Sequence, residues 1–219
     1  MLAGCLSAVL RKLTLCTVRS VASAPEPWRS RHGSTHRAEE RLGRLESRHA
    51  IHEVLMRYCR AIDRLDVPLL RSCYHQGSWD DHGHYKGDGH EFAEFIVRSL
   101  AERAHHTTHA VANVLIEMDA VDADLARAES YALAHLRRTD PLGVEWLDLF
   151  SGRYPDCFER RDGTWRITER VVVHDWSAST VLDPATAFPL PMDGFTQGRR
   201  DEQDAVYLPG PRSGAAQSG

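Results

Sequence analysis

The spacing of apolar residues changes once along the chain, from a helical period to a strand period. Ile51, Leu55, Tyr58 and Ile62 follow one another at intervals of 4, 3 and 4 residues. This spacing predicts one apolar face of an amphipathic helix that runs from about residue 45 to residue 64. A second helix is expected directly after it, because Asp66 is a good cap and the first turn of a helix tolerates proline.

A short hairpin is predicted over residues 77–87, followed by a third helix over residues 88–101. Four long strands then follow, at 106–118, 122–138, 144–160 and 164–176. Asp162-Gly163 joins the last two strands and is a strong hairpin signal. Long antiparallel strands after three helices predict an α+β fold, in which a curved, mostly antiparallel sheet wraps the helices.

This pattern assigns the folded domain to residues 42–180. Residues 1–24 contain basic residues and no acid, which fits a transit-like segment, an export signal or an upstream extension. Residues 25–41 are polar and rich in arginine, and we expect them to be disordered. Residues 181–219 are expected to form a C-terminal tail, since they are rich in Pro, Gly, Ser and Gln.

Charge and cysteine content narrow the classes of function. Residues 1–48 hold nine Lys and Arg against four Asp and Glu, and the remaining residues hold 18 against 27. An acidic main part excludes a nucleic-acid footprint and disfavours an anionic membrane as partner. The five cysteines are odd in number and form no C-x-x-C pair, which argues against a disulfide framework or a thiolate zinc site and for a reducing, cytoplasmic compartment. Cys59 and Cys73 are expected to be core residues.

Several motifs together resemble one known family. In chain order they are Tyr58 to Asp63, Tyr85-Lys86-Gly87, Thr108-His109, Gly152-Arg153-Tyr154, Phe158 to Gly163, Trp165-Arg166-Ile167 and Arg170. They resemble the SnoaL-like branch of the nuclear-transport-factor-2-like superfamily, over about residues 42–178. That branch includes hexachlorocyclohexane dehydrochlorinase, bile acid 7α-dehydratase and, more distantly, scytalone dehydratase.

The resemblance implies a cone-shaped fold with an internal pocket, catalysis without metal or cofactor, and a homodimer or homotrimer formed through the outer face of the sheet. It also implies that Tyr58, Asp63, His109 and Arg170 are the catalytic residues. The dehydrochlorinase has a lysine in its first helix that has no counterpart here, and its hairpin before the position of Tyr85 is longer. These two departures favour dehydration over haloalkane chemistry.

The residue types agree with proton abstraction. His109 can accept a proton near neutral pH, and a carboxylate such as Asp63 on its other ring nitrogen would fix the tautomer. Without the resemblance, a histidine on an apolar strand is more often structural than catalytic. Asp63 would then be read as a surface acid paired with Arg60 or Arg64, although a carboxylate at a helix C-terminus is disfavoured. The resemblance reverses this preference in favour of a catalytic pair.

Arg170 is a candidate cation for an enolate or a leaving hydroxide, or else a strand arginine paired with Glu159 or Asp148. Tyr58 lies about 140° around the helix from Asp63 and is expected to donate its phenol to a substrate oxygen, or to serve as a core aromatic. A second group of residues is expected to line the pocket: Trp79, Tyr85, Asn113, His174 and Trp176.

The segment Asp80-Asp81-His82-Gly83-His84 invites a metal interpretation, because alternation places Asp80, His82 and His84 on one side of a strand. A turn-rich exposed hairpin is the plainer interpretation, and we predict no metal. The sequence therefore predicts a cofactor-independent lyase (dehydratase) or isomerase for a hydrophobic cyclic molecule such as a steroid, polyketide or terpenoid. The alternatives are a non-catalytic binding or assembly module and the small subunit of a ring-hydroxylating dioxygenase.

Overall fold

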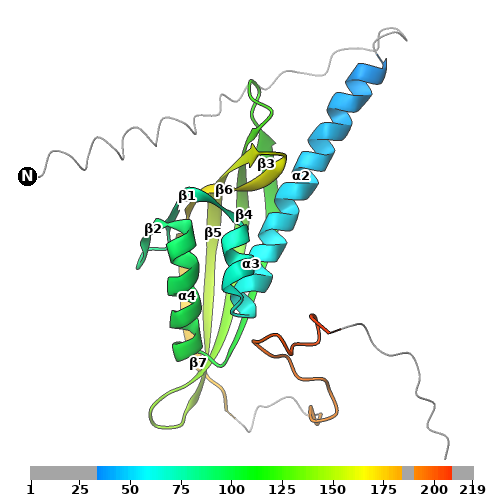
Figure 1. Cartoon of the computed structure of the whole chain (residues 1–219). Helices are drawn as coiled ribbons and strands as arrows, with labels where there is room; N and C mark the ends of the chain where they lie inside the picture. Colours follow the sequence, from blue (N-terminus) through cyan, green and yellow to red (C-terminus); the bar gives the residue numbers. More distant parts are fainter. Residues whose placement is uncertain (1–33, 184–189, 209–219) are drawn as a thin grey trace, which may run out of the picture.

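The long first helix forms the centre of the fold. In the computed structural model, which describes residues 34–183 and 190–208, helix α2 spans Ser34–Asp63. The four residues of the predicted stripe, Ile51, Leu55, Tyr58 and Ile62, are at most 2% exposed. The helix packs this stripe against strands β3 and β6 (Figure 1). The helical prediction is confirmed, and the stripe is the largest contribution of any helix to the core.

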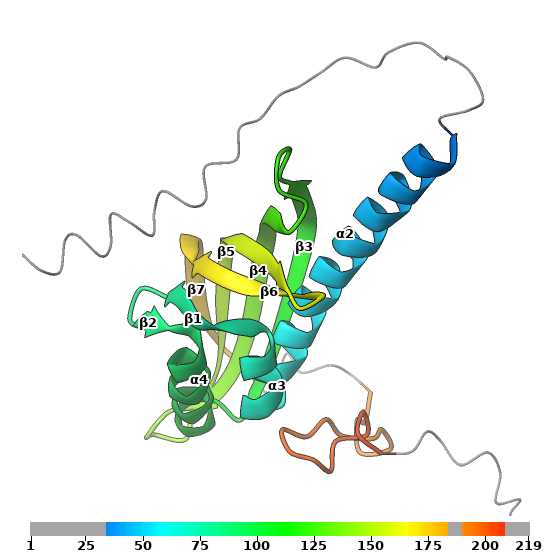
Figure 2. The ribbon, with the colours of Figure 1, turned by 45° about the horizontal axis from the view of Figure 1, so that its top comes forward.

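Helix α2 begins earlier than predicted. Residues 34–41 are helical, so the expectation of disorder over 25–41 is wrong for this part. The side chains of His36 to Leu42 are exposed, and this end of α2 extends past the edge of the sheet (Figure 2). Its Arg, Ala, Glu and Leu residues are strong helix formers, and His36 lies 3.1 Å from Glu40 one turn later. High local helix propensity therefore explains why residues 34–41 are helical, although their polar composition suggested disorder. Residues 1–33 lie outside the described residues.

Two short connections place the next helices. Leu65 adopts a left-handed conformation with φ of 55°, which ends the first helix. Asp66 then caps α3 (Val67–Ser72) by accepting a hydrogen bond of 2.9 Å from the backbone N–H of Leu69. Strands β1 (Tyr74–Asp81) and β2 (Lys86–Asp88) form the predicted hairpin. Asp88 caps α4 (Gly89–Arg103) by accepting from the backbone N–H groups of its first turn.

The remaining strands complete one sheet. They are β3 (His106–Met118), β4 (Leu125–Thr139), β5 (Glu145–Arg161), β6 (Thr164–Val171) and β7 (Val173–Val181). The strand order is β2-β1-β6-β5-β4-β3, with β7 also paired to β5. All pairs are antiparallel except β1 with β6. The sheet curves behind the three helices of the described part (Figures 1 and 2), which confirms the predicted α+β fold.

Two irregularities change which side chains face the helices. Strand β3 has a register shift at Asn113, whose φ is 49°, so the alternation of side chains moves by one residue. The predicted strand 164–176 is broken at Val172 into β6 and β7. A Cβ atom at Gly152 would lie 2.2 Å from the carbonyl oxygen of Val173, so only glycine allows β5 and β7 to approach this closely.

Within the segment expected to be a C-terminal tail, residues 199–207 contact the domain. Asp204 is only 4% exposed and lies 3.3 Å from the guanidinium of Arg64 at the end of α2. Arg200 donates to the carbonyl oxygens of Leu100 and Ala104 at the end of α4. Residues 199–207 therefore cover the ends of these two helices.

Cys59 and Cys73 are free and buried, as predicted. Among the helices of the described residues, none has the length and apolar character needed to cross a membrane.

Candidate active site

Asp63 and His109 meet inside the fold. Asp63 is the last residue of α2, and His109 lies near the start of β3, where its side chain faces the helices. The Nδ1 atom of His109 lies 2.7 Å from Oδ1 of Asp63. The backbone N–H of His109 also donates to both carboxylate oxygens, at 3.1 and 2.9 Å. The structure thus joins two residues that are 46 positions apart in the sequence.

These contacts define the chemical state of the pair. A carboxylate accepts hydrogen bonds, so Nδ1 carries a proton and Nε2 is left as the basic nitrogen. The three contacts also compensate for placing a carboxylate at a helix C-terminus, where the macrodipole disfavours it. The side chains of His109 and Asp63 are 12% and 11% exposed, so the pair is largely shielded but not sealed. This arrangement can orient a general base and stabilise the imidazolium that forms.

The surface partners that the sequence offered for Asp63 are engaged elsewhere. Arg64 pairs with Asp204, and the guanidinium of Arg60 lies over the ring of Tyr207. Burial lowers the pKa of Arg200 below its ordinary value, and the nearby negative charge of Asp63 opposes that shift. The hydrogen bonds of Asp63 go to His109.

Small side chains surround His109 on the inner face of the sheet. Its neighbour on β4 is Ala134, Val111 on the same face pairs with Ala132, and Ala132 pairs with Gly152 on β5. Phe150 on β5 is paired with Ala134 on the same face and is a partly exposed apolar residue. The side chains next to His109 on the inner face of the sheet are therefore small or apolar.

Arg170 is fully buried on β6, in contact with two tyrosines. Its Nε and Nη2 atoms donate to the two carboxylate oxygens of Asp156, at 2.7 and 2.6 Å. Its guanidinium carbon lies 4.0 Å from the ring centre of Tyr58 and 4.2 Å from that of Tyr154. Burial alone would lower the pKa of Arg170, but the Asp156 carboxylate raises it well above its ordinary value. Arg170 is therefore a permanent cation between two aromatic rings.

Neither strand partner expected for Arg170 is correct. Glu159 pairs with Arg161 at 2.6 Å, and Asp148 pairs with Arg138 at 2.6 Å. The partner is Asp156, which alternation along β5 places on the inner face with Tyr154 and Phe158, and all three are buried. The hairpin register, which pairs Asp156 with Arg170, is the signal that identifies it.

Tyr58 belongs to a buried polar cluster that sequence reasoning missed. Its hydroxyl lies 3.2 Å from Nε2 of His82, and Nδ1 of His82 is bonded to Asp80. Asp80 also accepts a hydrogen bond of 2.6 Å from the hydroxyl of Tyr74. Burial raises the pKa of Tyr58 well above its ordinary value, and the positive charge of Arg170 only partly opposes that shift. Tyr58 therefore keeps its proton at neutral pH.

The expectation that Asp80 and His82 belong to an exposed hairpin is wrong. Asp80 is 0% exposed, and the His82 ring stacks on Phe92 at 4.0 Å with an interplanar angle of 21°. Within residues 34–183 and 190–208, no group of three His, Cys, Asp or Glu side chains is placed to hold a metal ion. The one sequence signal for this cluster was the alternation of Asp80 and His82, which had suggested metal ligands.

Three residues expected to line the pocket face outward. Trp79 is 37% exposed on β1, because alternation buries its neighbours Ser78 and Asp80 instead. Asn113 lies at the β3 irregularity and is exposed. Trp176 is 54% exposed on β7, since the break at Val172 changes the phase of alternation after Arg170. For Asn113 and Trp176 the reason is a strand irregularity that the periodicity did not reveal, and for Trp79 it is the alternation of β1 itself.

The other two lie closer to the interior. Tyr85 is partly buried, donates a hydrogen bond of 2.8 Å to the carbonyl oxygen of Asp88, and stacks on Phe95 at 5.1 Å. His174 is largely exposed, although its ring lies 5.7 Å from that of Phe150 on the inner face of β5. Neither residue has a bond with the Asp63–His109 pair.

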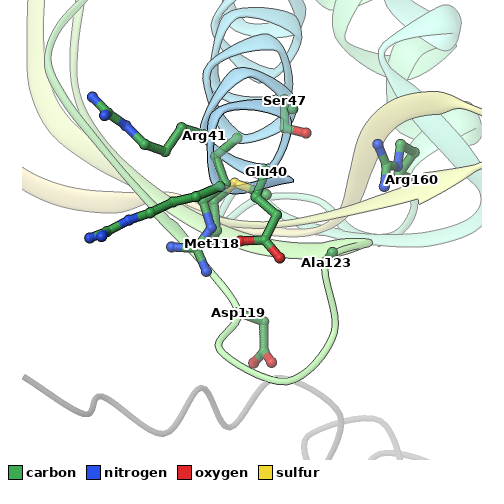
Figure 3. A pocket seen from close by; sticks show the side chains of 10 residues that line it. Glu40, Arg41, Ser47, Met118, Asp119, Ala123 and Arg160 are labelled. Atoms are coloured by element: carbon green, nitrogen blue, oxygen red, sulfur yellow. The ribbon is translucent and has the colours of Figure 1, made fainter. Parts of the chain in front are cut away.

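A separate surface pocket of about 600 Å³ lies at the other end of α2 (Figure 3). Helix α2, the β3–β4 turn and strand β5 line it with four arginines and two acids, namely Arg37, Arg41, Arg44, Arg160, Glu40 and Asp119. Its innermost helix residue, Ser47, is 16 residues from Asp63 in α2, or about 24 Å along the axis. We therefore do not assign the reaction to this pocket.

Comparison with known proteins gives a consistent family. A family model for the SnoaL-like domain matches residues 43–171. No curated protein is significantly similar to the chain in sequence.

Solved structures share the fold at low identity. A protein assigned as a scytalone dehydratase from Novosphingobium aromaticivorans has a TM-score of 0.55 and 19% identity, covering 62% of this chain and 89% of its own. Hexachlorocyclohexane dehydrochlorinase type 3 from Novosphingobium barchaimii has a TM-score of 0.56 and 24% identity, covering 68% and 99%. A protein assigned as an aromatic ring hydroxylase from N. aromaticivorans has a TM-score of 0.52 and 18% identity, covering 63% and 94%. At these identities the likeness shows a shared fold.

Proposed function

Because the chain belongs to the SnoaL-like domain family, in the nuclear-transport-factor-2-like superfamily, we propose that it is a cofactor-independent lyase or isomerase. In this proposal it removes a proton from a carbon atom of a hydrophobic cyclic molecule, such as a steroid, polyketide or terpenoid. Dehydration is the favoured outcome. The dehydratase and dehydrochlorinase named among the structural neighbours make this class of chemistry a natural one for the fold.

The observation that carries the proposal is the 2.7 Å contact between His109 Nδ1 and Asp63 Oδ1. With Nδ1 held by the carboxylate, Nε2 is free to take a proton from carbon, and Asp63 stabilises the resulting imidazolium. The apolar surroundings strengthen this electrostatic effect, because they keep the local dielectric low.

In this proposal Tyr58 is the general acid of the reaction, and Arg170 assists it. Tyr58 would donate its phenolic proton to the leaving oxygen. Arg170, 4.0 Å from the ring centre, would stabilise the phenolate that remains. Both residues are fully buried, so in this proposal the substrate reaches Tyr58 from inside the fold and water does not compete for its proton.

A chromogenic ketone tests the base. Removal of a C2 proton from 3-(4-nitrophenoxy)cyclohexanone gives cyclohexenone and coloured 4-nitrophenolate, whose departure needs no acid. His109→Ala is expected to lower kcat by at least ~100-fold, the usual contribution of a general base. His106→Ala is the matched control, because His106 lies on the same strand but is exposed on the opposite face. Full activity in His109→Ala, or a wild-type rate equal to that of buffer, would contradict the proposal.

The two alternative functions predict different results with the same purified protein. A non-catalytic binding module would bind cyclic ketones without turnover. The small subunit of a ring-hydroxylating dioxygenase would co-purify with a large iron-bearing subunit and would be inactive without it.

We also propose that the protein forms a homodimer or homotrimer through the outer face of the sheet. This face exposes Tyr131, Leu133 and Trp176, which are 43%, 39% and 54% exposed. Leu133 and Trp176 are both paired with Ser151, so they flank this residue on the same face, one strand away on either side. Exposed apolar side chains gathered on one face are typical of interaction surfaces. Sedimentation analysis of the wild type and Trp176→Glu tests this, with a monomeric wild type as the contradicting result.

A further inference from the structure

We propose that Asp80 and His82 form a proton relay that supplies Tyr58, so that a second histidine–aspartate pair serves the acid side of the reaction. His82 is a positioning residue in this scheme, because it acts through the Tyr58 hydroxyl. The inference rests on the proposed function, in which Tyr58 protonates the leaving oxygen.

The geometry of the relay is continuous. The buried Asp80 carboxylate accepts from Tyr74 through Oδ2 at 2.6 Å and binds Nδ1 of His82 through Oδ1. The other ring nitrogen, Nε2, lies 3.2 Å from the hydroxyl oxygen of Tyr58. Phe92 stacks on the imidazole at 4.0 Å and fixes its plane. Two contacts therefore link Asp80 to Tyr58 through the ring of His82.

In the relay that we propose, His82 carries a proton on both ring nitrogens, next to the buried carboxylate of Asp80. Two carboxylates, Asp80 and Asp156, are 0% and 2% exposed, and the cation Arg170 is bonded to Asp156. An uncompensated buried charge is strongly unfavourable, and an imidazolium at His82 balances Asp80. The charged His82 donates Nε2–H to the Tyr58 oxygen, which leaves the Tyr58 proton free for a substrate.

His82 also provides a route by which protons from solvent can reach Tyr58. Tyr58 has no exposed surface, so bulk water does not restore its proton directly. The hydroxyl of Tyr58 contacts His82, and the side chain of Arg170 also interacts with Tyr58. The His82 side chain is 17% exposed, which makes it a route between Tyr58 and solvent.

The two histidine–aspartate pairs are attached to one helix. Tyr58 and Asp63 are five residues apart in α2, which corresponds to about 7.5 Å along the axis and about 140° around it. In this proposal a substrate ring presents its C–H bond to His109 and its leaving oxygen to Tyr58.

The complete step balances in atoms and electrons. In 3-hydroxycyclohexanone, His109 takes a C2 proton, and that electron pair forms the C2–C3 double bond while the C3–O bond breaks. The leaving oxygen takes the Tyr58 proton and departs as water. Tyr58 in turn takes the Nε2 proton of His82. Cyclohexenone is the product, and solvent then returns the proton from His109 to His82.

A pair of probes that differ only in the leaving group tests the relay. Hydroxide leaves 3-hydroxycyclohexanone only when it is protonated, whereas 4-nitrophenolate leaves the aryloxy ketone unaided. His82→Asn is the informative variant, because its amide N–H lies where Nδ1–H did and keeps the bond to Asp80. It is expected to lose kcat on the hydroxy ketone by about 100-fold and to retain the wild-type rate on the aryloxy ketone. His84→Asn, on the same hairpin and exposed, is expected to change neither rate.

Tyr58→Phe is expected to show the same selective loss, and the double variant with His82→Asn no further loss, because both residues act in one path. Equal losses of His82→Asn on both ketones, or multiplicative losses in the double variant, would overturn the relay. Full activity of His109→Ala on both ketones would instead overturn the proposed function, so the two failures are distinguishable.

Discussion

Replacing Asp63 with asparagine separates its two contributions, one to stability and one to the state of His109. Asparagine has nearly the same shape but only one acceptor oxygen. If that oxygen keeps the backbone N–H of His109, now 2.9–3.1 Å from the carboxylate, the amide NH₂ faces Nδ1. The imidazole must then carry its proton on Nε2, and the base is lost.

The expected magnitudes follow from these contacts. Loss of one hydrogen bond to a charged group costs about 1.5–3 kcal/mol of unfolding free energy, because both side chains are only 11–12% exposed and are little screened by solvent. For a chain of this size that corresponds to a decrease in Tm of roughly 3–12 °C. The kcat on 3-(4-nitrophenoxy)cyclohexanone is expected to decrease at least ~100-fold, as for removal of a general base.

Urea unfolding and the nitrophenolate assay on the same preparation measure both quantities. The matched control is Asp66→Asn, three residues further on. Asp66 caps α3 through the Leu69 N–H, and asparagine caps equally well, so stability and kcat are expected to stay close to the wild type. If Asp63→Asn loses stability but keeps kcat within a few-fold of the wild type, Asp63 only anchors the backbone and the reasoning is refuted.

Two further predictions concern buried groups. Asp156→Asn leaves a fully buried guanidinium without its carboxylate and is expected to lower the free energy of unfolding in urea by about 3–5 kcal/mol. The control, Asp148→Asn, breaks a partly exposed pair and is expected to lower it by less than about 1 kcal/mol. Equal losses in the two variants would contradict this account. Burial raises the pKa of Cys59 to about 12 and of Cys73 to about 11. At pH 8 both thiols of the folded protein are therefore expected to react with an aromatic disulfide reagent at least on the order of 100-fold more slowly than those of the protein unfolded in urea. Rapid reaction of both in the folded protein would refute it.

The fold was largely predictable because its periodic signals are long. The four-residue stripe of α2 and the strands of 13 to 17 residues are strong patterns, and Asp162-Gly163 identifies the β5–β6 turn, where both residues have positive φ. What could not be predicted were local interruptions. The bulge at Asn113 and the break at Val172 follow from how the sheet bends, and a period-2 pattern has no signal for either.

The same interruptions explain which site residues were placed correctly. Asp63 and His109 lie before any irregularity in their elements, and the structure brings them together as the resemblance implied. Trp176 lies beyond the break at Val172, so the alternation that placed it beside Arg170 no longer applied. Asp80 and His82 lie in the interior, although a run of polar residues is typical of an exposed turn. Their burial depends on Tyr58, Tyr74 and Phe92, which only the tertiary structure brings near.

The central claim is that His109 takes a proton from carbon in the step that limits the rate. The most direct measurement compares kcat/KM of the wild-type protein on 3-(4-nitrophenoxy)cyclohexanone with hydrogen and with deuterium at C2. The account predicts a primary isotope effect in the wild type, together with loss of at least ~100-fold of the rate in His109→Ala. Equal rates for the two isotopologues, combined with an unchanged rate in His109→Ala, would contradict it.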